Sequence, residues 1–433
     1  MMAVREMSEP RVDDRRATAI AVLRLLFGDG FARAFAVRLW DGTEIEASET
    51  ASFTLLVNAP EALRAALLPP DELSAGRAFV NGLLDCEGDV EAAVALLQRT
   101  FATFEPRAFP SLLALLMRLP KPGAYDHGGE AHLRGRRHSL ARDRAAIGFH
   151  YDQPIAFYRA FLDRDLVYSC AYFDDGVETL DHAQTAKIDH VLRKLRLQAG
   201  ERLLDIGCGW GSLVVRAAER FGARVLGVTL STRQHEEALR RVHQAGLSAS
   251  ARVELRDYRE LQHEPPFDKI VSVGMFEHVG RAKLPEYFET AYALLRPGGL
   301  FLNHGISAHA GEHRGGLHRK GFVERFVFPD GELVAISDAL QVAERTGFEV
   351  RDVENLREHY ARTLRCWVAN LERNRAAAVE AADERTYRVW RLYMAGSAQG
   401  FAAGRMGLHQ SLLARPTVAG SVELPATRRD LYV

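Results

Sequence analysis

One cysteine of this sequence stands where it could take part in chemistry. Cys170 lies within YSCAYF (168–173), flanked by aromatic residues and well ahead of any glycine-rich loop. A cysteine in this setting serves as a small buried hydrophobe, a nucleophile, a metal ligand or part of a binding surface. The remaining cysteines lie far apart and form no Cys-x-x-Cys pair, namely Cys86, Cys208 and Cys366. That spacing argues against a zinc site or a disulfide framework and suits a reducing cytoplasm.

Other side chains that could do chemistry fall near the ends of expected strands. Glu277 and His278 close the segment FDKIVSVGMFEH, and His304 lies in the apolar segment LFLNHGIS. Ligands of doubly wound folds bind at the carboxyl ends of the parallel strands, so these side chains could face a site. The alternatives are a solvated loop for the first two and a satisfied core histidine for the third. Tyr360, just ahead of an expected helix, could bind a ligand or simply pack.

A glycine-rich turn follows the first apolar strand of this region. LLDIGCGWGS contains Gly207, Gly209 and Gly211, which permit a tight strand-to-helix turn and the close approach of a ligand. A dinucleotide fingerprint needs G-x-G-x-x-G, and its third glycine would fall on Ser212. The next strand ends in GVTLS, without the acidic residue that would hold a ribose. The dinucleotide interpretation is therefore weak, and a turn without a ligand is the other alternative.

Strand-like and helix-like segments alternate around that turn. This alternation predicts a doubly wound, mostly parallel sheet. Strands are expected within 201–211, 224–231, 251–258, 267–280 and 300–307, and helices within 212–222, 232–246 and 284–299, the last stopped by Pro-Gly-Gly. Further helices are expected at 142–163 and 178–197 and over the C-terminal hundred residues.

Length and composition limit the classes of protein to consider. A chain of 433 residues is too long for one ordinary domain. Its 47% apolar and 26% charged residues are usual for a soluble globular protein, and its formal net charge of −1 argues against a broad nucleic-acid footprint. The charged N-terminal segment has no apolar core of a secretory signal, and no window approaches the roughly 18 apolar residues of a spanning helix. Any membrane role should therefore be peripheral.

The sequence predicts two domains joined by a linker. The stretch 119–139 combines Pro, Gly, His and Arg without periodicity, which is typical of a linker. Ahead of it, alternating segments around Asp41-Gly42 predict a β-hairpin, and two segments that start with Pro60 and Asp89 predict helices. The expected organisation is a smaller N-terminal α+β domain at 1–125, a linker at 126–145 and a catalytic domain at 146–433.

The motifs after successive strands resemble those of class I S-adenosylmethionine-dependent methyltransferases. These are the Asp-x-Gly-x-Gly-x-Gly turn, Asp257-Tyr258 after the third strand and Pro-Gly-Gly before the fifth. The resemblance implies a Rossmann-like α/β fold with S-adenosylmethionine as co-substrate. It implies that Gly207, Gly209 and Trp210 face the methionine part, Thr229 and Gln234 the ribose, and Asp257 and Tyr258 the adenine, while Tyr168 and Ser169 close over the methionine end.

An ordered set of motifs narrows the resemblance to one family. HYD (150–152), YSCAYF, DIGCGWG, GVTLS, RDY, VSVGMFEHVG, LNHGI, FPDGEL and HYARTLRCW occur in this order. Together they resemble the cyclopropane-fatty-acyl-phospholipid synthase family, which includes mycolic acid cyclopropane synthases and related fatty-acyl methyltransferases. The resemblance is dense over about residues 148 to 415 and looser before them. It implies transfer of a methylene group from S-adenosylmethionine to the double bond of unsaturated phospholipid acyl chains.

The resemblance also implies a mechanism and a set of site residues. The alkene attacks the sulfonium methyl, a carbocation forms, and a bound bicarbonate ion removes a proton so that the ring closes. The implied bicarbonate ligands are Cys170, Glu277, His304, the backbone of Ile306, and Tyr360, with no metal. A small anion held by a thiol, an imidazole, a phenol and an N–H donor is chemically sensible, and Glu277 fits if it accepts the O–H of bicarbonate.

Two other functions remain open, and three departures from the family bear on the product. The carbocation could lose a different proton and leave a methyl or methylene branch, or the chain could be a lipid-binding protein without catalysis. The chain has Gln153–Ala156 where relatives have other residues, Ser397 in place of a cysteine and His409 in place of a tryptophan. We expect a cytoplasmic protein that associates peripherally with the inner face of the membrane. Its N-terminal domain would dock on the membrane or form a homodimer.

Overall fold

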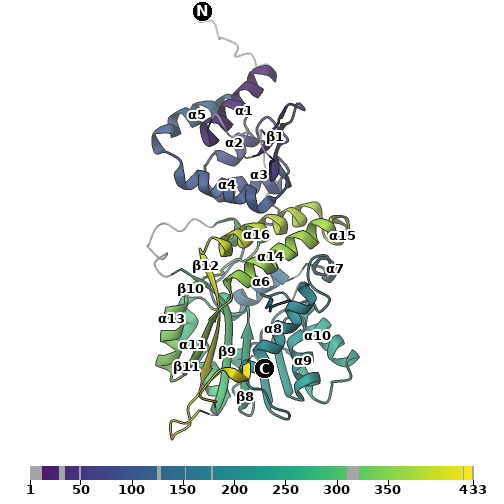
Figure 1. Ribbon diagram of the computed structural model, residues 1–433, viewed down its shortest axis with the longest axis vertical. Helices are drawn as coiled ribbons and strands as arrows, with labels where there is room; N and C mark the ends of the chain where they lie inside the picture. Colours follow the sequence, from purple (N-terminus) through teal and green to yellow (C-terminus); the bar gives the residue numbers. More distant parts are fainter. Residues whose placement is uncertain are drawn as a thin grey trace, which may run out of the picture. The chain divides into compact units, whose positions relative to one another are not determined.

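The computed structural model describes residues 12–28, 35–47, 50–123, 128–151, 153–176, 179–309, 321–422 and 424–431. The chain divides into two compact units (Figure 1). One unit comprises Met1–Glu130, Arg319–Val323 and Glu384–Gln399, and the other comprises Ala131–His318, Glu324–Asp383 and Gly400–Val433. Among the described residues, no helix combines the length and the apolar character needed to cross a membrane.

The first unit contains a four-stranded sheet with helices. Its strands are β1 (Ala36–Leu39), β2 (Glu44–Ile45), β3 (Phe53–Val57) and β4 (Leu84–Gly88), in the spatial order β2-β1-β3-β4. Its helices are α1 (Val12–Phe27), α2 (Ala62–Leu67), α3 (Glu72–Val80), α4 (Val90–Thr103), η2 (Pro106–Ala108) and α5 (Phe109–Arg118). The predicted hairpin is confirmed, because β1 and β2 pair antiparallel across Asp41-Gly42, and Gly42 has φ +83°. Asp89 caps α4 as expected, since its side chain accepts a hydrogen bond from the Ala92 N–H.

The second unit is built on a sheet of eight strands, which is mostly parallel as predicted but contains three strands more than the five expected. Its strands are β5 (Arg202–Ile206), β6 (Arg224–Thr229), β7 (Ala251–Leu255), β8 (Phe267–Val273), β9 (Leu295–Ala308), β10 (Val334–Ala335), β11 (Glu349–Asn355) and β12 (Met406–Ala414). The spatial order is β11-β12-β9-β8-β5-β6-β7, and β10 pairs with β9. β12 runs antiparallel to both of its neighbours, and the other pairs are parallel. Strands β11 and β12 were not expected, because the C-terminal hundred residues were predicted to contain only helices.

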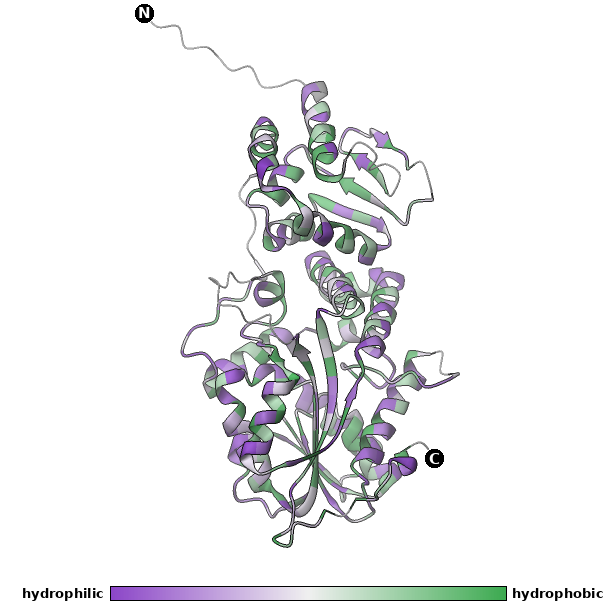
Figure 2. Cartoon of the chain, turned by 60° about the vertical axis from the view of Figure 1, so that its left-hand side comes forward, coloured by the Kyte–Doolittle hydropathy of each residue, from purple (hydrophilic) through white to green (hydrophobic). Residues whose placement is uncertain are grey.

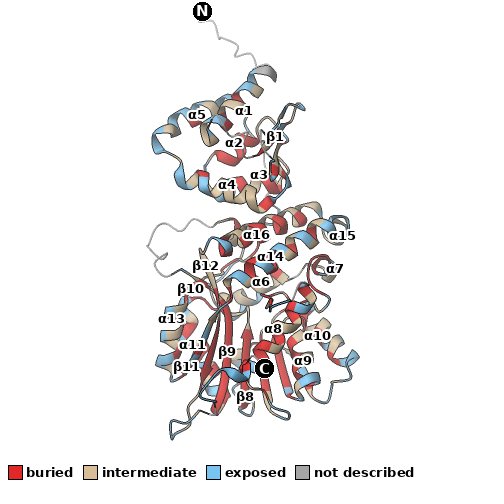
Figure 3. Ribbon diagram, viewed as in Figure 1, coloured by how far each residue is buried: buried red, intermediate tan, exposed pale blue. Residues whose placement is uncertain are grey.

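Helices cover both faces of this sheet (Figure 1). Residues of α8 (Leu180–Lys194) and α9 (Ser212–Phe221) form one core with alternate strand residues such as Leu203 and Leu302. Residues of α11 (Leu284–Leu294) and α13 (Ile336–Thr346) form a second core on the other face with Leu204 and Phe301. Because successive strand residues face opposite sides, Leu203 and Leu204 belong to different cores. Figure 3 shows the resulting burial of the central strands, and Figure 2 shows helices that carry hydrophobic and hydrophilic residues.

Eleven further helical segments complete the fold of the described residues. They are α6 (Leu140–Tyr151), α7 (Ile155–Arg159), α10 (Thr232–Gln244), η3 (Tyr258–Glu260), η4 (Phe276–His278), η5 (Arg281–Lys283), α12 (Phe322–Phe326), α14 (Arg357–Arg373), α15 (Arg375–Ala381), α16 (Glu384–Ala402) and η6 (Arg429–Leu431). The last three residues of α16 belong to the second unit and its earlier residues to the first.

Four local expectations need correction. The helix expected at 142–163 is interrupted, because α6 ends at Tyr151 and α7 starts after Pro154. The Asp152 of the HYD motif lies outside the described residues. The Pro-Gly-Gly turn does not stop α11, which ends at Leu294. The turn lies inside β9, where Gly298 and Gly299 pair with Arg415 beyond β12.

The other two corrections concern site residues. Glu277 and His278 lie in the short helix η4 after β8, rather than in the strand itself. Tyr360 does not precede a helix but lies in the first turn of α14. Glu277 and His278 still lie close to the carboxyl edge of the sheet, and Tyr360 lies on a helix that packs on the sheet.

Candidate active site

A cavity lies at the carboxyl edge of the parallel strands β5, β6, β7 and β8 in the second unit. It encloses about 1230 Å³ including its open mouth. Its walls contain segments that directly follow these strands, which is the usual ligand site of a doubly wound sheet. All nine residues that the resemblance assigned to the cofactor line this cavity: Tyr168, Ser169, Gly207, Gly209, Trp210, Thr229, Gln234, Asp257 and Tyr258.

The glycine turn between β5 and α9 serves two different purposes. Gly209 has φ +54°, and a Cβ built on it would meet no atom within 4 Å, so the backbone there faces open space. Gly211 has φ +84°, and a Cβ there would lie 2.9 Å from the Cβ of Ala238 on α10. Gly209 therefore leaves room for a ligand, whereas Gly211 allows α10 to pack against the turn.

A buried hydroxyl–amide pair stands where a dinucleotide site would have a carboxylate. At the end of β6 the Oγ1 of Thr229 donates a hydrogen bond of 2.8 Å to the Oε1 of Gln234. Ser231 caps α10, because its Oγ accepts a hydrogen bond from the backbone N–H of Gln234 at 3.3 Å. The cap and the hydroxyl together fix the Gln234 side chain at the wall of the cavity.

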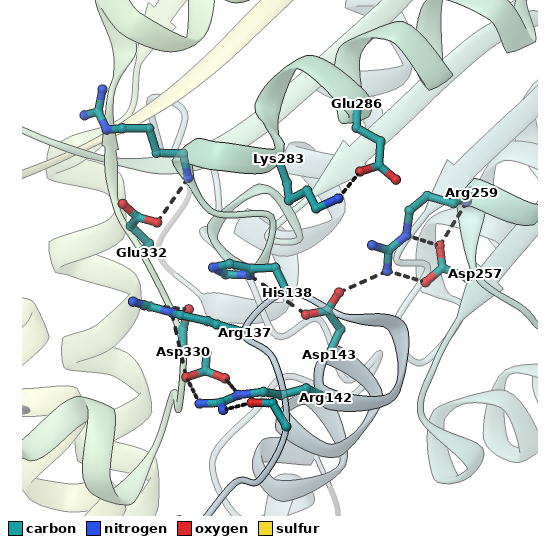
Figure 4. A network of polar contacts seen from close by, with 12 residues as sticks. Arg137, His138, Arg142, Asp143, Asp257, Arg259, Lys283, Glu286, Asp330 and Glu332 are labelled. Atoms are coloured by element: carbon teal, nitrogen blue, oxygen red, sulfur yellow. Dashed lines mark hydrogen bonds and ion pairs between the residues drawn. The ribbon is translucent and has the colours of Figure 1, made fainter.

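Asp257 is engaged in an ion-pair network. Its carboxylate accepts hydrogen bonds from the backbone N–H and from Nε of Arg259, at 2.9 Å and 2.8 Å. The same guanidinium also binds Asp143 of α6 at 3.0 Å, so Arg259 lies between the two carboxylates (Figure 4). Arg142, next to Asp143, pairs with Asp330. The network ties α6 to the cavity wall, and Arg259 and Asp143 were not expected from the sequence.

Lys187 is a third residue of the cavity wall that was not expected from the sequence. It is 2% exposed, and its Nζ donates a hydrogen bond of 2.8 Å to the Oγ of Ser169. Burial lowers the pKa of Lys187 to about 8. Burial also raises the pKa of Asp205, at the end of β5, to about 7, although Lys187 opposes that shift.

A signal for Lys187 was present in the sequence. Gln184 and Lys187 occupy helical positions that otherwise carry Leu180, Ala183, Ile188 and Val191 on the buried face of α8. Polar residues at positions of an apolar stripe are rarely buried without a partner or a ligand. The polar residues Gln184 and Lys187 within this apolar stripe therefore indicated that this part of α8 faces a partner or a ligand.

The five residues that the resemblance assigned to the anion do not line this cavity. They converge next to it through a chain of short contacts. The Sγ of Cys170 lies 3.8 Å from the carbonyl oxygen of Leu356, which also accepts the backbone N–H of Tyr360 at 3.1 Å. The N–H of Leu356 binds the carbonyl oxygen of Leu408 at 2.8 Å, and Leu408 is the register partner of Ile306.

Glu277 and His304 lie on the side of β9. With Cys170, Ile306 and Tyr360 they form a group next to the cavity, which we call the second cluster. The Oε1 of Glu277 accepts a hydrogen bond of 2.6 Å from the backbone N–H of Ile306. His304 lies two residues before Ile306 in the same strand, so both side chains project from one face of the sheet. These contacts link the four segments of the chain that carry Cys170, Glu277, His304 with Ile306, and Tyr360.

The YSCAYF segment forms a wall between the cavity and this cluster. Tyr168 and Ser169 line the cavity, whereas Cys170 is fully buried, with its Sγ 3.1 Å from the carbonyl oxygen of Ala171 and 3.8 Å from that of Leu356. The ring centroid of Tyr168 lies 5.2 Å from that of Trp367, and the ring of Tyr360 meets the same Trp367 edge-on at 6.1 Å. Aromatic side chains therefore connect the two sides of the wall.

Burial controls the protonation states of the cluster. It raises the pKa of Glu277 to about 7, although the N–H of Ile306 opposes the shift. Burial lowers the pKa of His304 well below its usual range and raises that of the Cys170 thiol, so both are neutral near pH 7. In the described part of the chain, the buried Oε2 of Glu277 and Nε2 of His304 have no hydrogen-bond partner. Buried polar atoms without a protein partner are uncommon, and a bound water, ion or ligand can satisfy them.

The raised pKa of Glu277 predicts a measurable pH dependence of stability. Its folded-state pKa of about 7 exceeds its unfolded value of 4.5. The protonated carboxyl is therefore favoured in the folded state, and this contribution is lost as the pH rises through 7. The Glu277→Gln variant should gain up to about 3 kcal/mol of unfolding free energy relative to the parent protein between pH 4.5 and 8.5. Urea unfolding at both pH values checks this, and equal differences at the two pH values would contradict it.

No metal cluster stands out in the described residues. Across the ranges given above, no group of three or more His, Cys, Asp and Glu side chains could hold a metal ion.

Two of the departures from the resembling family can be placed in the second unit. Pro154, in the Gln153–Ala156 segment, forms the N-cap of α7. His409, in β12, pairs through its Nδ1 with the Oγ of Ser307 in β9 at 2.9 Å. Ser397 lies in the α16 residues that belong to the first unit. Nothing in the structure explains why Ser397 replaces a cysteine.

Known proteins resemble this chain over most of its length. A model of the mycolic acid cyclopropane synthetase family matches residues 138–411. A probable fatty acid methyltransferase of Pseudomonas putida is 41% identical over 400 residues, which are 92% of this chain and 95% of that protein. Cyclopropane mycolic acid synthase 1 of Mycobacterium tuberculosis is 37% identical over 278 residues, 61% of this chain and 95% of its own. A crystal structure of a mycolic acid cyclopropane synthase complexed with SAH and CTAB is 36% identical. The match covers 62% of this chain and 97% of the synthase, with a TM-score of 0.58.

Proposed function

This chain belongs to the mycolic acid cyclopropane synthetase family, and from that premise we propose that it forms cyclopropane rings on unsaturated fatty acyl chains. Its fold is that of class I S-adenosylmethionine-dependent methyltransferases, with S-adenosylmethionine as co-substrate. The observation that carries the ring-forming proposal is the pair of buried atoms without partners, Glu277 Oε2 and His304 Nε2, next to the cavity.

The residues of the cavity fit S-adenosylmethionine, which supplies an electrophilic methyl group when bound. Gly209 leaves open space for the methionine part beside the turn. The fixed Thr229–Gln234 pair offers polar atoms for a ribose, and the Asp257–Tyr258 segment borders the space for an adenine. The buried ammonium of Lys187 at Ser169 is complementary to a carboxylate at the methionine end.

The proposed chemistry places unusual demands on the second cluster. An alkene is a weak nucleophile that cannot be activated by deprotonation, so orientation and stabilisation of the cation must supply the catalysis. The π electrons form the new carbon–carbon bond while the sulfur–carbon bond breaks, and the positive charge moves to the neighbouring carbon. Loss of a proton from the transferred methyl then allows its carbon to close the ring. A base must therefore lie close to the methyl group.

We propose that a bicarbonate ion supplies this base in the second cluster. The neutral thiol of Cys170, the neutral imidazole of His304 and the phenol of Tyr360 can each donate a hydrogen bond to an anion. Glu277 Oε2 can accept the O–H that a bicarbonate ion carries. The carboxylate also adds negative charge near the developing cation, which favours that cation.

A second outcome of the same chemistry is favoured by one comparison. The relative that matches 92% of this chain is named a probable fatty acid methyltransferase. If the cation loses a proton from a neighbouring chain carbon, a methyl-branched alkene results. If a hydride first moves from the methyl-bearing carbon to the cationic carbon, loss of a methyl proton leaves a methylene branch. Mild hydrogenation of lipids from an expressing host separates the outcomes, because a branched alkene takes up hydrogen and a cyclopropane does not.

We further propose that the acyl chains belong to membrane phospholipids and that the protein associates peripherally with the membrane. On α5 of the first unit, exposed Phe109 and Met117 stand near Arg107 and Arg118, a combination that suits an anionic lipid surface. Flotation of the full chain with anionic vesicles tests this part of the proposal. Replacement of Phe109 and Met117 by serine should reduce binding, and unchanged binding would contradict docking through α5.

The role proposed for Cys170 predicts a mild effect of its replacement. Cys170→Ser keeps a hydrogen-bond donor at the anion, so turnover should fall by about tenfold or less. A thiolate nucleophile would not survive this change. Cys366→Ser, at a half-buried position of α14, is the matched control and should leave turnover unchanged. Complete loss of activity in Cys170→Ser alone would contradict the proposed role.

A further inference from the structure

A buried glutamine contacts the catalytic-site histidine from the neighbouring strand. Gln410 of β12 is 0% exposed, and its Nε2 lies 3.2 Å from the Nδ1 of His304. The two residues are direct register partners in the antiparallel β12–β9 pair. Cross-strand partners of this kind project their side chains to the same face of the sheet, so the contact follows from the register itself.

The glutamine interrupts an apolar stripe. Leu408 and Leu412, two residues before and after Gln410 on the same face of β12, are buried leucines. The Oε1 of Gln410 has no hydrogen-bond partner in the described part of the chain. A buried amide with an unsatisfied oxygen is destabilising relative to an apolar side chain of similar size. Packing alone therefore does not account for a glutamine at this position.

The contact determines which nitrogen of His304 carries hydrogen. An amide nitrogen only donates hydrogen bonds, so the Nδ1 of the ring must accept. Burial keeps the ring neutral, and a neutral imidazole carries a single hydrogen. That hydrogen therefore resides on Nε2, the buried atom that has no partner among the described residues.

Charged residues lie behind the glutamine in the same row of side chains. Glu354 of β11 is the register partner of Gln410, on the side away from His304. Its carboxylate is held by His190 at 2.8 Å and by Lys194, both on α8. Gln410 thus lies between the half-buried carboxylate of Glu354 and the ring of His304.

We propose that Gln410 is a positioning residue for His304. Gln410 holds the His304 ring as the Nε2–H tautomer, and the Nε2–H then donates a hydrogen bond to an anion in the second cluster. The value of this tautomer for catalysis rests on the proposed function, whereas the tautomer itself does not. Because the proposed bicarbonate ion directs its one O–H to Glu277, only its acceptor oxygens remain for His304. The opposite tautomer would present a lone pair to these oxygens and weaken the binding of the ion.

Nitrogen-15 spectra of histidine-labelled protein test the tautomer directly. The signal of His304 is assigned by its absence in His304→Gln. In the parent protein we expect a protonated Nε2 and an unprotonated Nδ1. Gln410→Met conserves volume but removes the donor, so both tautomers should become populated. Ser411→Ala, the next residue of β12 on the opposite face, is the control and should leave the spectrum unchanged.

Steady-state kinetics test the consequence for the anion. Gln410→Met should raise the KM for bicarbonate by about tenfold, with the KM for S-adenosylmethionine unchanged and kcat largely recovered at high bicarbonate. A His304 ring that keeps one tautomer in Gln410→Met would overturn the inference. If the tautomer preference is lost but turnover is unchanged in both Gln410→Met and His304→Ala, the positioning inference stands and the proposed role of His304 fails.

Discussion

Replacement of Glu277 by glutamine is expected to reduce turnover by about 10²–10³-fold, the usual effect of removing one preorganised electrostatic contact from an active site. In the variant, the amide oxygen of the glutamine would take the place of Glu277 Oε1 and would still accept a hydrogen bond from the N–H of Ile306. At the position of Oε2, however, an NH₂ group would donate instead of accept, and the negative charge would be lost. The variant should therefore fold while losing both the acceptor for the bicarbonate O–H and the charge that favours the cation.

Binding of S-adenosylhomocysteine separates this effect from damage to the cofactor site. Glu277 does not line the cofactor cavity, so calorimetry should give the variant an affinity within about twofold of the parent protein. Glu289→Gln, on the exposed side of α11, is the matched control and should keep full turnover. Unchanged product formation in Glu277→Gln, or in His304→Ala, would overturn the assignment of the second cluster.

The second large effect is expected for Gly211→Ala. The new side chain would occupy φ +84°, a conformation that costs about 1–2 kcal/mol for a residue with a Cβ. It would also lie 2.9 Å from the Cβ and 3.1 Å from the Cα of Ala238, so α10 would have to move. Because α10 carries Gln234 at the cavity wall, its displacement should weaken S-adenosylhomocysteine binding by about tenfold or more.

A second glycine isolates the clash from the backbone strain. Gly246 has φ +69°, but a Cβ there would meet no atom within 4 Å. Gly246→Ala should therefore lower stability by about 1 kcal/mol and leave the affinity for S-adenosylhomocysteine unchanged. Equal affinities in Gly211→Ala and Gly246→Ala, measured by calorimetry, would contradict the role given to Gly211.

The strand-and-turn pattern predicted a ligand site at the glycine turn, and the resemblance to methyltransferases predicted the other residues of the cofactor cavity. Gly207, Thr229 and Asp257 each end or directly follow a parallel strand, and such ends meet at one edge of the sheet. Their neighbourhood in space therefore follows from local features of the sequence. Lys187 was missed because it lies within a helix, where only its place in an apolar stripe indicates that it faces the cavity.

Features that depend on distant partners could not be predicted in the same way. The antiparallel pairing of β12 with β9 joins residues about a hundred positions apart, and no local pattern specifies that register. The contact of Gln410 with His304 and the placement of Pro-Gly-Gly inside β9 both depend on it. The ion pairs of Arg259 with Asp143 and Asp257 likewise join an early helix to a later strand end.

The central claim is that a proton leaves the transferred methyl group itself and that ring closure follows. An expressing host fed methionine with a trideuterated methyl group tests this most directly, by mass spectrometry of its lipid acyl chains before and after mild hydrogenation. We predict a product that retains two of the three deuterium atoms and takes up no hydrogen, and that is absent when the host expresses His304→Ala. A product that retains all three deuterium atoms, or one that takes up hydrogen, would contradict the claim.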